Sequence, residues 1–280
     1  MADGSFAPSR PRPAIRVRKL DHDFSEVPRY WFFGSALATH LANGVNLLFP
    51  DGERFFIRSV KHYLDQIDDP ELEKRARAFF GQEGAHGHAH ETAFAILQRQ
   101  GYEIDGWLTW YRKLAFEQLV KTVPPVMRLS VTVALEHFTA TMAEQGLSSG
   151  FLEQADPAMS KLLRWHACEE IEHKSVAFDV LQHVDPRYHV RVAGMVIATL
   201  ALFGFWRSAT KHLLDQDLAA GRVDDKRLRR ERREANAKGH NRAWLPRAIA
   251  AYLRPSFHPD DHDNYELARR YLSSIGRLDG

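Results

Sequence analysis

The sequence has almost no cysteine: its 280 residues include one, Cys168. A single Cys excludes an internal disulfide and any Cys-rich zinc or iron–sulfur site. The 15 His residues, in contrast, are many for this length. Any metal site in this chain must therefore be built from His and carboxylate ligands.

The chain also has little net charge and no signal of export. Its 38 Lys and Arg stand against 36 Asp and Glu, a net charge of +2, so no nucleic-acid partner is expected. The N-terminal stretch has no apolar core after its first charges, which argues against a secretory signal. Together with the single Cys, this predicts a cytoplasmic protein.

Long hydrophobic runs are absent as well. The apolar stretch from Val192 to Trp206 has fifteen residues without a charge, and about 20 are needed to span a bilayer. Two interpretations stay open: a buried core or homodimer-interface helix, and a helix that lies on a membrane surface or lines an apolar pocket. The cations at 226–233 would support weak membrane contact through 192–206 and 226–233. They are equally compatible with a solvated linker, because acidic residues lie beside them.

The remaining pattern predicts an all-α fold. Asp69-Pro70, Asp156-Pro157 and Asp185-Pro186 are typical helix starts, with Asp as cap and Pro in the first turn. No stretch shows the rhythm of a sheet protein. The predicted helices cover one or two segments within 35–67, then 70–100, 106–122, 125–147, 157–184 and a segment after 186. The predicted organisation is a flexible, Pro-rich lead-in at 1–20, a bundle at 21–215, and a basic linker with a C-terminal helical extension at 216–280.

Two Glu-x-x-His pairs predict a metal site. Glu83 and His86 are three residues apart and so share a helix face, and Glu170 and His173 repeat this spacing. Each pair offers one oxygen and one nitrogen ligand. Two such helices, plus a Glu from each of two others, make the site of ferritin-like di-metal proteins.

The two additional glutamates are present in the required order. Glu53 lies thirty residues before Glu83, and Glu136 lies thirty-four before Glu170. Two antiparallel helices with a short loop bring residues at such spacing to similar height. The expected fold is therefore a ferritin-like four-helix bundle of two helix-hairpin halves, with additional N- and C-terminal helices.

Other His and Glu residues near these pairs are less decisive. His166 shares the face of Glu170 and His173 and is a candidate ligand, with a hydrogen-bonding role behind the ligands as the alternative. His90, one turn after His86, is expected in that supporting role. Residues predicted to point away from the ligand faces are His88, Glu91, His137, Glu169 and Glu172, and Glu144 is a spare on the Glu136 helix. Glu169 and Glu172 are expected to be solvated.

The segments that carry these ligands resemble a bacterial family labelled "predicted metal-dependent hydrolase", a ferritin-like group. The likeness covers roughly 24–215 and rests on Leu48–Phe56, Gly81–His86, Ala134–Thr139 and Trp165–Lys174. The pattern of His166, Glu170 and His173 is also similar to that of di-iron arylamine N-oxygenases, in which the extra His ligates iron.

Three functions are compatible with such a site. We expect foremost an oxidoreductase with two metal ions, Fe, Mn or a mixed pair, which activates dioxygen to oxidise an apolar or aromatic small molecule. The catalytic residues, acting through the metals, would be Glu53, Glu83, His86, Glu136, Glu170 and His173. The metal ligands would be these six and His166. The Trp107, Trp110 and Tyr111 cluster favours an aromatic substrate. Since no Gly-rich dinucleotide fingerprint is present, electrons would come from an external donor. The alternatives are a hydrolase that uses a metal-activated bridging water, and a non-catalytic metal-binding bundle.

Overall fold

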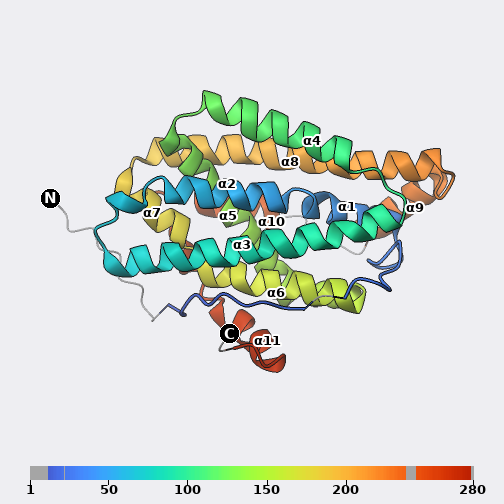
Figure 1. Cartoon of the computed structure of the whole chain (residues 1–280), viewed down its shortest axis with the longest axis horizontal. Helices are drawn as coiled ribbons and strands as arrows, with labels where there is room; N and C mark the ends of the chain where they lie inside the picture. Colours follow the sequence, from blue (N-terminus) through green and yellow to red (C-terminus); the bar gives the residue numbers. More distant parts are fainter. Residues whose placement is uncertain (1–11, 22, 238–243, 279–280) are drawn as a thin grey trace.

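The computed structural model describes residues 12–21, 23–237 and 244–278. Apart from one isolated bridge between Phe32 and Ala155, these residues contain no strand. The predicted all-α class is therefore confirmed, and Figure 1 shows long helices lying side by side. The helices are α1 (Ala36–Asn46), α2 (Phe49–Lys61), α3 (Pro70–Arg99), α4 (Asp105–Arg112), α5 (Pro125–Ser148), α6 (Pro157–His173), α7 (Val176–Val184), α8 (Tyr188–Ala219), α9 (Asp225–Ala237), α10 (Trp244–Tyr252) and α11 (Tyr265–Ser274).

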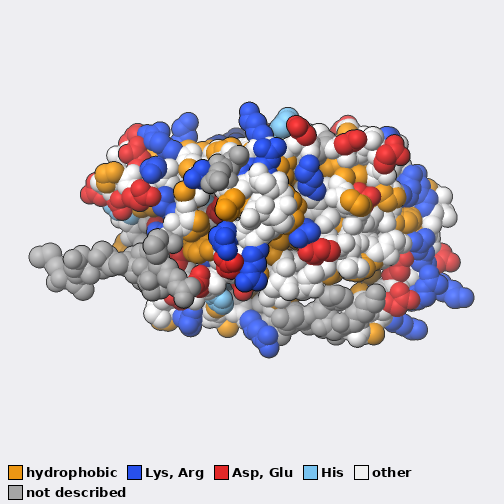
Figure 2. Space-filling view, turned by 90° about the horizontal axis from the view of Figure 1, so that it is seen from below, with side chains coloured by type: hydrophobic (Ala, Val, Ile, Leu, Met, Phe, Trp, Pro, Cys, Tyr) orange, Lys and Arg blue, Asp and Glu red, His pale blue; other side chains and the backbone are white. Residues whose placement is uncertain are grey.

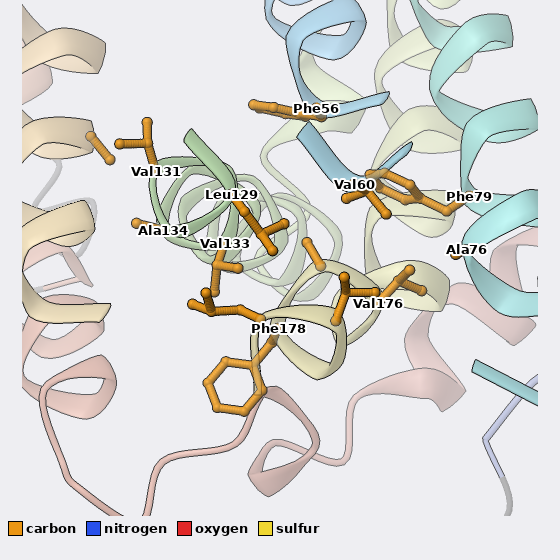
Figure 3. Close-up of a cluster of buried hydrophobic side chains, with 14 of the residues drawn as sticks. Phe56, Val60, Ala76, Phe79, Leu129, Val131, Val133, Ala134, Val176 and Phe178 are labelled. Carbon is orange, nitrogen blue, oxygen red and sulfur yellow. The ribbon is translucent and has the colours of Figure 1, made fainter. Parts of the chain in front are cut away.

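The centre of the molecule is formed by α2, α3, α5 and α6. Helix α2 packs along α3, α5 packs along α6, and α2 also contacts α5. Buried apolar side chains at one end of this group fix the distance between the helices. Figure 3 shows the side chains of α2, α3, α5 and α7 that meet there, among them Phe56, Phe79, Leu129 and Val176. This packing holds the polar faces of the same helices together.

The helix starts follow the Asp-Pro signals in two of three places. The Asp69 side chain accepts hydrogen bonds from the amides of Glu71 and Leu72, and the Asp156 side chain accepts one from Ala158. Helix α8 begins later than predicted, at Tyr188, because Asp185 binds the amide and guanidinium of Arg187 instead of a helix end.

Two predicted helices are interrupted. The segment predicted as one helix at 157–184 breaks after His173, where the buried Lys174 turns its ammonium group to Asn264 Oδ1, 2.7 Å away. The segment at 106–122 is α-helical only to Arg112 and continues as a π-helix (Lys113–Gln118) and a 3₁₀-helix (Leu119–Thr122). No residue from Lys113 to Thr122 is fully buried, so little packing favours regular α geometry there.

The apolar segment at 192–206 lies in α8, and only one face of it is buried. Met195 and Ala198 pack in the core, whereas Leu200 is 71% exposed. By length and composition alone α8 could cross a membrane, and 28% of its apolar window is buried inside the protein. The prediction of a core helix is therefore correct for one face and wrong for the other.

The basic cluster at 226–233 is not a linker. It forms α9, which packs on α1 through the buried Glu231. Glu231 accepts hydrogen bonds from Ser35 Oγ and Leu37 N, which join α9 to the start of α1, and it pairs with Arg227 within α9. The cations that face away from α1 are exposed, as expected.

Candidate metal centre

Four glutamates from four different helices meet inside the bundle. Glu53 is on α2, Glu83 on α3, Glu136 on α5 and Glu170 on α6, and each is at most 3% exposed. Gly87 on α3 allows the approach of α2, because a Cβ at this position would lie 3.0 Å from Glu53 Oε2. All four glutamates predicted from the sequence are thus brought together.

The histidines of the two Glu-x-x-His pairs point into the same space. His173 Nε2 lies 3.1 Å from Glu83 Oε1 and 3.4 Å from Glu136 Oε2. His86 Nδ1 lies 3.9 Å from Glu83 Oε1 and 3.8 Å from Glu170 Oε1. Because each His lies among carboxylates from other helices, the two pairs form one centre.

His166 belongs to the same centre. Its Nε2 lies 2.8 Å from Glu170 Oε1 and 3.9 Å from Glu53 Oε1. Its Nδ1 lies 2.5 Å from Nε2 of His90, and Phe49 packs against both rings. His166 therefore faces the carboxylates directly, and His90 contacts it from behind.

The ligand atoms fall into three overlapping groups, within each of which all atoms lie within 4.8 Å of one another. Glu83 and His86 each occur in two groups, so the groups share ligands. The groups are Glu53, His86 and His166; Glu83, Glu136 and His173; and Glu83, His86 and Glu170.

Eight buried atoms of this centre lack hydrogen-bond partners from the protein. Both carboxylate oxygens of Glu53, Glu83 and Glu136 are without one, as are His86 Nδ1 and His173 Nε2. Burial of unpaired carboxylates is very unfavourable unless a cation compensates them. Six orphaned oxygens and two orphaned nitrogens that face one another therefore fit one or more metal ions.

Burial also changes the proton affinities of the centre. Desolvation, together with repulsion from neighbouring carboxylates, raises the pKa of Glu53, Glu83 and Glu136 well above the ordinary value. Burial lowers the pKa of His86. Burial would also raise the pKa of Glu170, but His173 and His166 hold it well below the ordinary value. These shifts describe the protein without a cation, which would favour ionised carboxylates and neutral imidazoles.

Side chains behind the ligands orient the two imidazoles. His86 Nε2 lies 3.0 Å from Glu169 Oε2, and His173 Nδ1 lies 2.9 Å from Gln82 Oε1. When these acceptors take the ring N–H, the other nitrogen of each ring keeps its lone pair towards the carboxylates. Hydrogen bonds of this kind are typical behind metal-bound His.

Glu169 and Glu172 are not solvated, contrary to the prediction. They are 0% and 5% exposed, and Arg18 bridges them with distances of 3.1 Å to Glu169 Oε1 and 2.7 Å to Glu172 Oε2. The lead-in, expected to be flexible over 1–20, thus places a buried guanidinium behind the centre; residues 1–11 lie outside the described part. The sequence analysis did not predict the role of Arg18, because no local pattern marks this residue. It also did not predict that Gln82 orients His173, although the position of Gln82 next to Glu83 could have indicated a place near the ligands.

The remaining candidates lie elsewhere. His88 is exposed, Glu91 pairs with Arg54, and His137 Nε2 hydrogen-bonds Ala248 O, so all three point away from the centre as predicted. Glu144 accepts a hydrogen bond from Asn264. The Trp107, Trp110 and Tyr111 cluster packs against α8 at Phe205 and Ser208 rather than forming a substrate pocket at the ligands.

The comparison with known families decides which chemistry this centre is associated with. A family model described as "Predicted metal-dependent hydrolase" matches residues 16–263. The chain belongs to this family. No curated protein and no solved structure matches.

Membership of the predicted metal-dependent hydrolases corrects the expected function. The family description names a metal-dependent hydrolase, so the expectation of a dioxygen-activating oxidoreductase is wrong. The alternative prediction, a metal-dependent hydrolase, agrees better with the family. Physically, the same carboxylate and imidazole ligands can hold a hydrolytic metal ion as well as a redox-active one, so the ligands alone could not separate the two functions. Hydrolysis consumes water and requires no electron donor.

Proposed function

We propose that this chain hydrolyses a small molecule at the Glu and His centre with the help of two divalent metal ions. The observation that supports the proposal is the set of eight orphaned donor atoms on Glu53, Glu83, Glu136, His86 and His173, which face one another in the interior. We further propose that α2, α3, α5 and α6 form a ferritin-like four-helix bundle, since each supplies one of the glutamates.

The ligands divide between two positions. Glu53 and His166, with His86, would hold one ion, and Glu136 and His173, with Glu83, the other. Glu170 belongs between them, because its Oε1 lies within 3.8 Å of a nitrogen of all three histidines. Oxygen and imidazole donors without thiolate suit Mn or Fe ions.

When bound, such ions lower the pKa of a coordinated water and polarise the oxygen of the bond to be cleaved. The protein keeps the ligands in place for this chemistry. The Thr139 hydroxyl donates a hydrogen bond to Glu170 Oε2, which fixes the orientation of this carboxylate. Glu169 and Gln82 fix the two imidazoles through the ring nitrogens that face outwards.

The charges around the centre favour a neutral ester or amide as substrate. A cationic side chain beside the ligands would help the metal ions to hold a phosphate substrate. Arg18 is engaged by Glu169 and Glu172, and Arg54 by Asp51 and Glu91. Apolar rings also border the imidazoles: Trp165 packs against His86 and Phe79 against His173. These contacts support the expectation of an apolar small molecule.

A metal-reconstitution assay tests the proposal. The purified protein is treated with a chelator, its metal content is measured by elemental analysis, and it is assayed on aryl esters, anilides and aryl phosphates with and without Mn²⁺ or Fe²⁺. We expect ester or anilide hydrolysis that requires the added metal and is lost in Glu136→Ala. Full hydrolysis by the metal-free protein, or by Glu136→Ala, would contradict a role for this centre.

A further inference from the structure

Helix α8 presents an apolar surface that the described residues leave uncovered. Val196, Ile197 and Leu200 are 55%, 40% and 71% exposed. This surface continues to α1, since Trp206 stacks on Phe203 and donates its indole N–H to Leu41 O. Leu41 itself is 42% exposed. We call this surface the apolar ridge; it consists of Leu41, Val196, Ile197, Leu200, Phe203 and Trp206.

Both ends of α8 are fixed to the body of the protein by buried charges. Near its start, the Arg191 guanidinium donates to Tyr252 O and Arg254 O. Near its end, Asp217 is fully buried and accepts hydrogen bonds from the hydroxyls of Tyr30 and Tyr102. Leaving the body to cross a bilayer would break these bonds and leave the charges unpaired. Only the exposed ridge can therefore meet another surface.

A cationic helix adjoins the ridge. The N-terminal end of α1, one turn before Leu41, is held by Glu231 of α9. Helix α9 carries six Lys and Arg against three Asp and Glu, a net charge of +3. Lys and Arg side chains gather at the right-hand end of the molecule in Figure 2, the end at which Figure 1 places α9. The exposed cations of α9 are Lys226, Arg229, Arg230, Arg232 and Arg233.

We propose that the apolar ridge and α9 together seat the protein on an anionic lipid bilayer surface. Exposed apolar side chains enter the boundary between headgroups and acyl chains, and nearby cations bind anionic headgroups. Charge complementarity favours this partner over a second copy of the chain. A second copy would bring only a further α9 with the same net charge of +3, whereas an anionic surface complements this charge. This surface is separate from the metal centre, so the proposal does not rest on the proposed hydrolysis.

Vesicle flotation of the full chain tests the proposal. We expect flotation with vesicles of phosphatidylcholine and phosphatidylglycerol and much less with phosphatidylcholine alone. Leu200→Glu should abolish flotation without unfolding the protein, because this side chain is mostly exposed. Arg229→Ala combined with Arg233→Ala should lower partitioning roughly tenfold or more, since each cation near an anionic surface contributes appreciably. Leu278→Glu, four residues after the end of α11, which Figure 1 places away from α8, is the matched control and should float like the wild type.

Several results would overturn the proposal. These are no flotation with anionic vesicles, equal flotation with neutral vesicles, and unchanged flotation of Leu200→Glu. Analytical ultracentrifugation gives a further contrary result. If the wild type is a dimer, Leu200→Glu is a monomer and neither of the two binds vesicles, the ridge is the contact surface for a second copy of the chain.

Discussion

His86 Nε2 and Glu169 Oε2 lie 3.0 Å apart, and Glu169 is in turn held by Arg18 and by the Trp165 indole N–H. Arg18 and Trp165 therefore fix the Glu169 carboxylate, and this carboxylate in turn orients the His86 imidazole. The second imidazole, of His173, is oriented by a neutral amide, Gln82, instead. The two halves of the centre thus share their ligand spacing and differ in what stands behind the ligands.

Replacement of Glu169 by Gln should weaken metal binding without removing a ligand. An amide is a weaker acceptor for the His86 N–H, and loss of such a partner commonly lowers metal affinity by about 10–100-fold. The measurement is a competition titration with a chromophoric chelator. Glu153→Gln, on the protein surface, is the control and should bind like the wild type. An affinity of Glu169→Gln within twofold of the control would contradict the orienting role.

Removal of a ligand should change the number of bound ions. Glu136→Ala and Glu170→Ala should each lose at least one metal ion per chain, because both carboxylates lie among the imidazoles of the centre. Glu144→Ala is a matched control from the same helix as Glu136, since its carboxylate contacts Asn264 away from the centre. Elemental analysis of the purified variants gives the stoichiometry. Unchanged stoichiometry in both Glu136→Ala and Glu170→Ala would refute the ligand assignment.

The features predicted correctly are those that short-range rules determine. Asp69 caps α3 because an Asp before a Pro fits a helix start, and Glu83 and His86 share a face because of the helical repeat. The order and spacing of Glu53 and Glu136 in the sequence were sufficient to predict that they lie at the same height in the bundle as the two Glu-x-x-His pairs.

The features missed depend on distant parts of the chain. Glu169 was expected in solvent because it faces away from Glu170 on its helix, but Arg18, 151 residues earlier, covers that side. At the break after His173, Lys174 is buried and contacts Asn264, 90 residues later. Helical periodicity shows which residues share a face, and it does not show which distant segment packs against each face.

Arg18 should be important for stability even though it lies outside the helices. Arg18→Met would leave Glu169 and Glu172 buried without their cation, and breaking a buried ion pair from one side costs about 3–5 kcal/mol. Urea unfolding of the metal-loaded protein measures the difference. Lys19→Ala, an exposed neighbouring position, should change the free energy of unfolding by less than about 0.5 kcal/mol. A similar small change for Arg18→Met would show that the pair contributes little.

The metal-free protein should lose stability as the pH rises above about 5, where the glutamates of the unfolded chain are ionised. Burial raises the pKa of Glu53, Glu83 and Glu136 well above the ordinary value. It raises the pKa of Glu169 to about 7, so the contribution of Glu169 is lost by about that pH. A carboxyl whose folded pKa is raised binds more protons in the folded state, so the free energy of unfolding falls with pH between the unfolded and folded pKa values. Burial lowers the pKa of His173, but the charges of Glu170 and Glu136 outweigh this effect, and the net pKa is raised. His173 therefore also makes the free energy of unfolding fall as it loses its proton with rising pH. His86, whose pKa burial lowers, opposes this trend only below about pH 6.5, where unfolded His is protonated.

Bound metal should remove this pH dependence, because cations favour the ionised carboxylates that burial otherwise disfavours. Thermal unfolding of the metal-free and metal-loaded proteins between pH 5 and 9 measures the effect. We expect the melting temperature of the metal-free protein to fall across this range and that of the loaded protein to stay nearly level. Metal-free Glu136→Gln should fall less steeply than metal-free wild type, since an amide cannot ionise. Parallel curves for all three samples would mean that the buried carboxylates do not control the stability of the bundle.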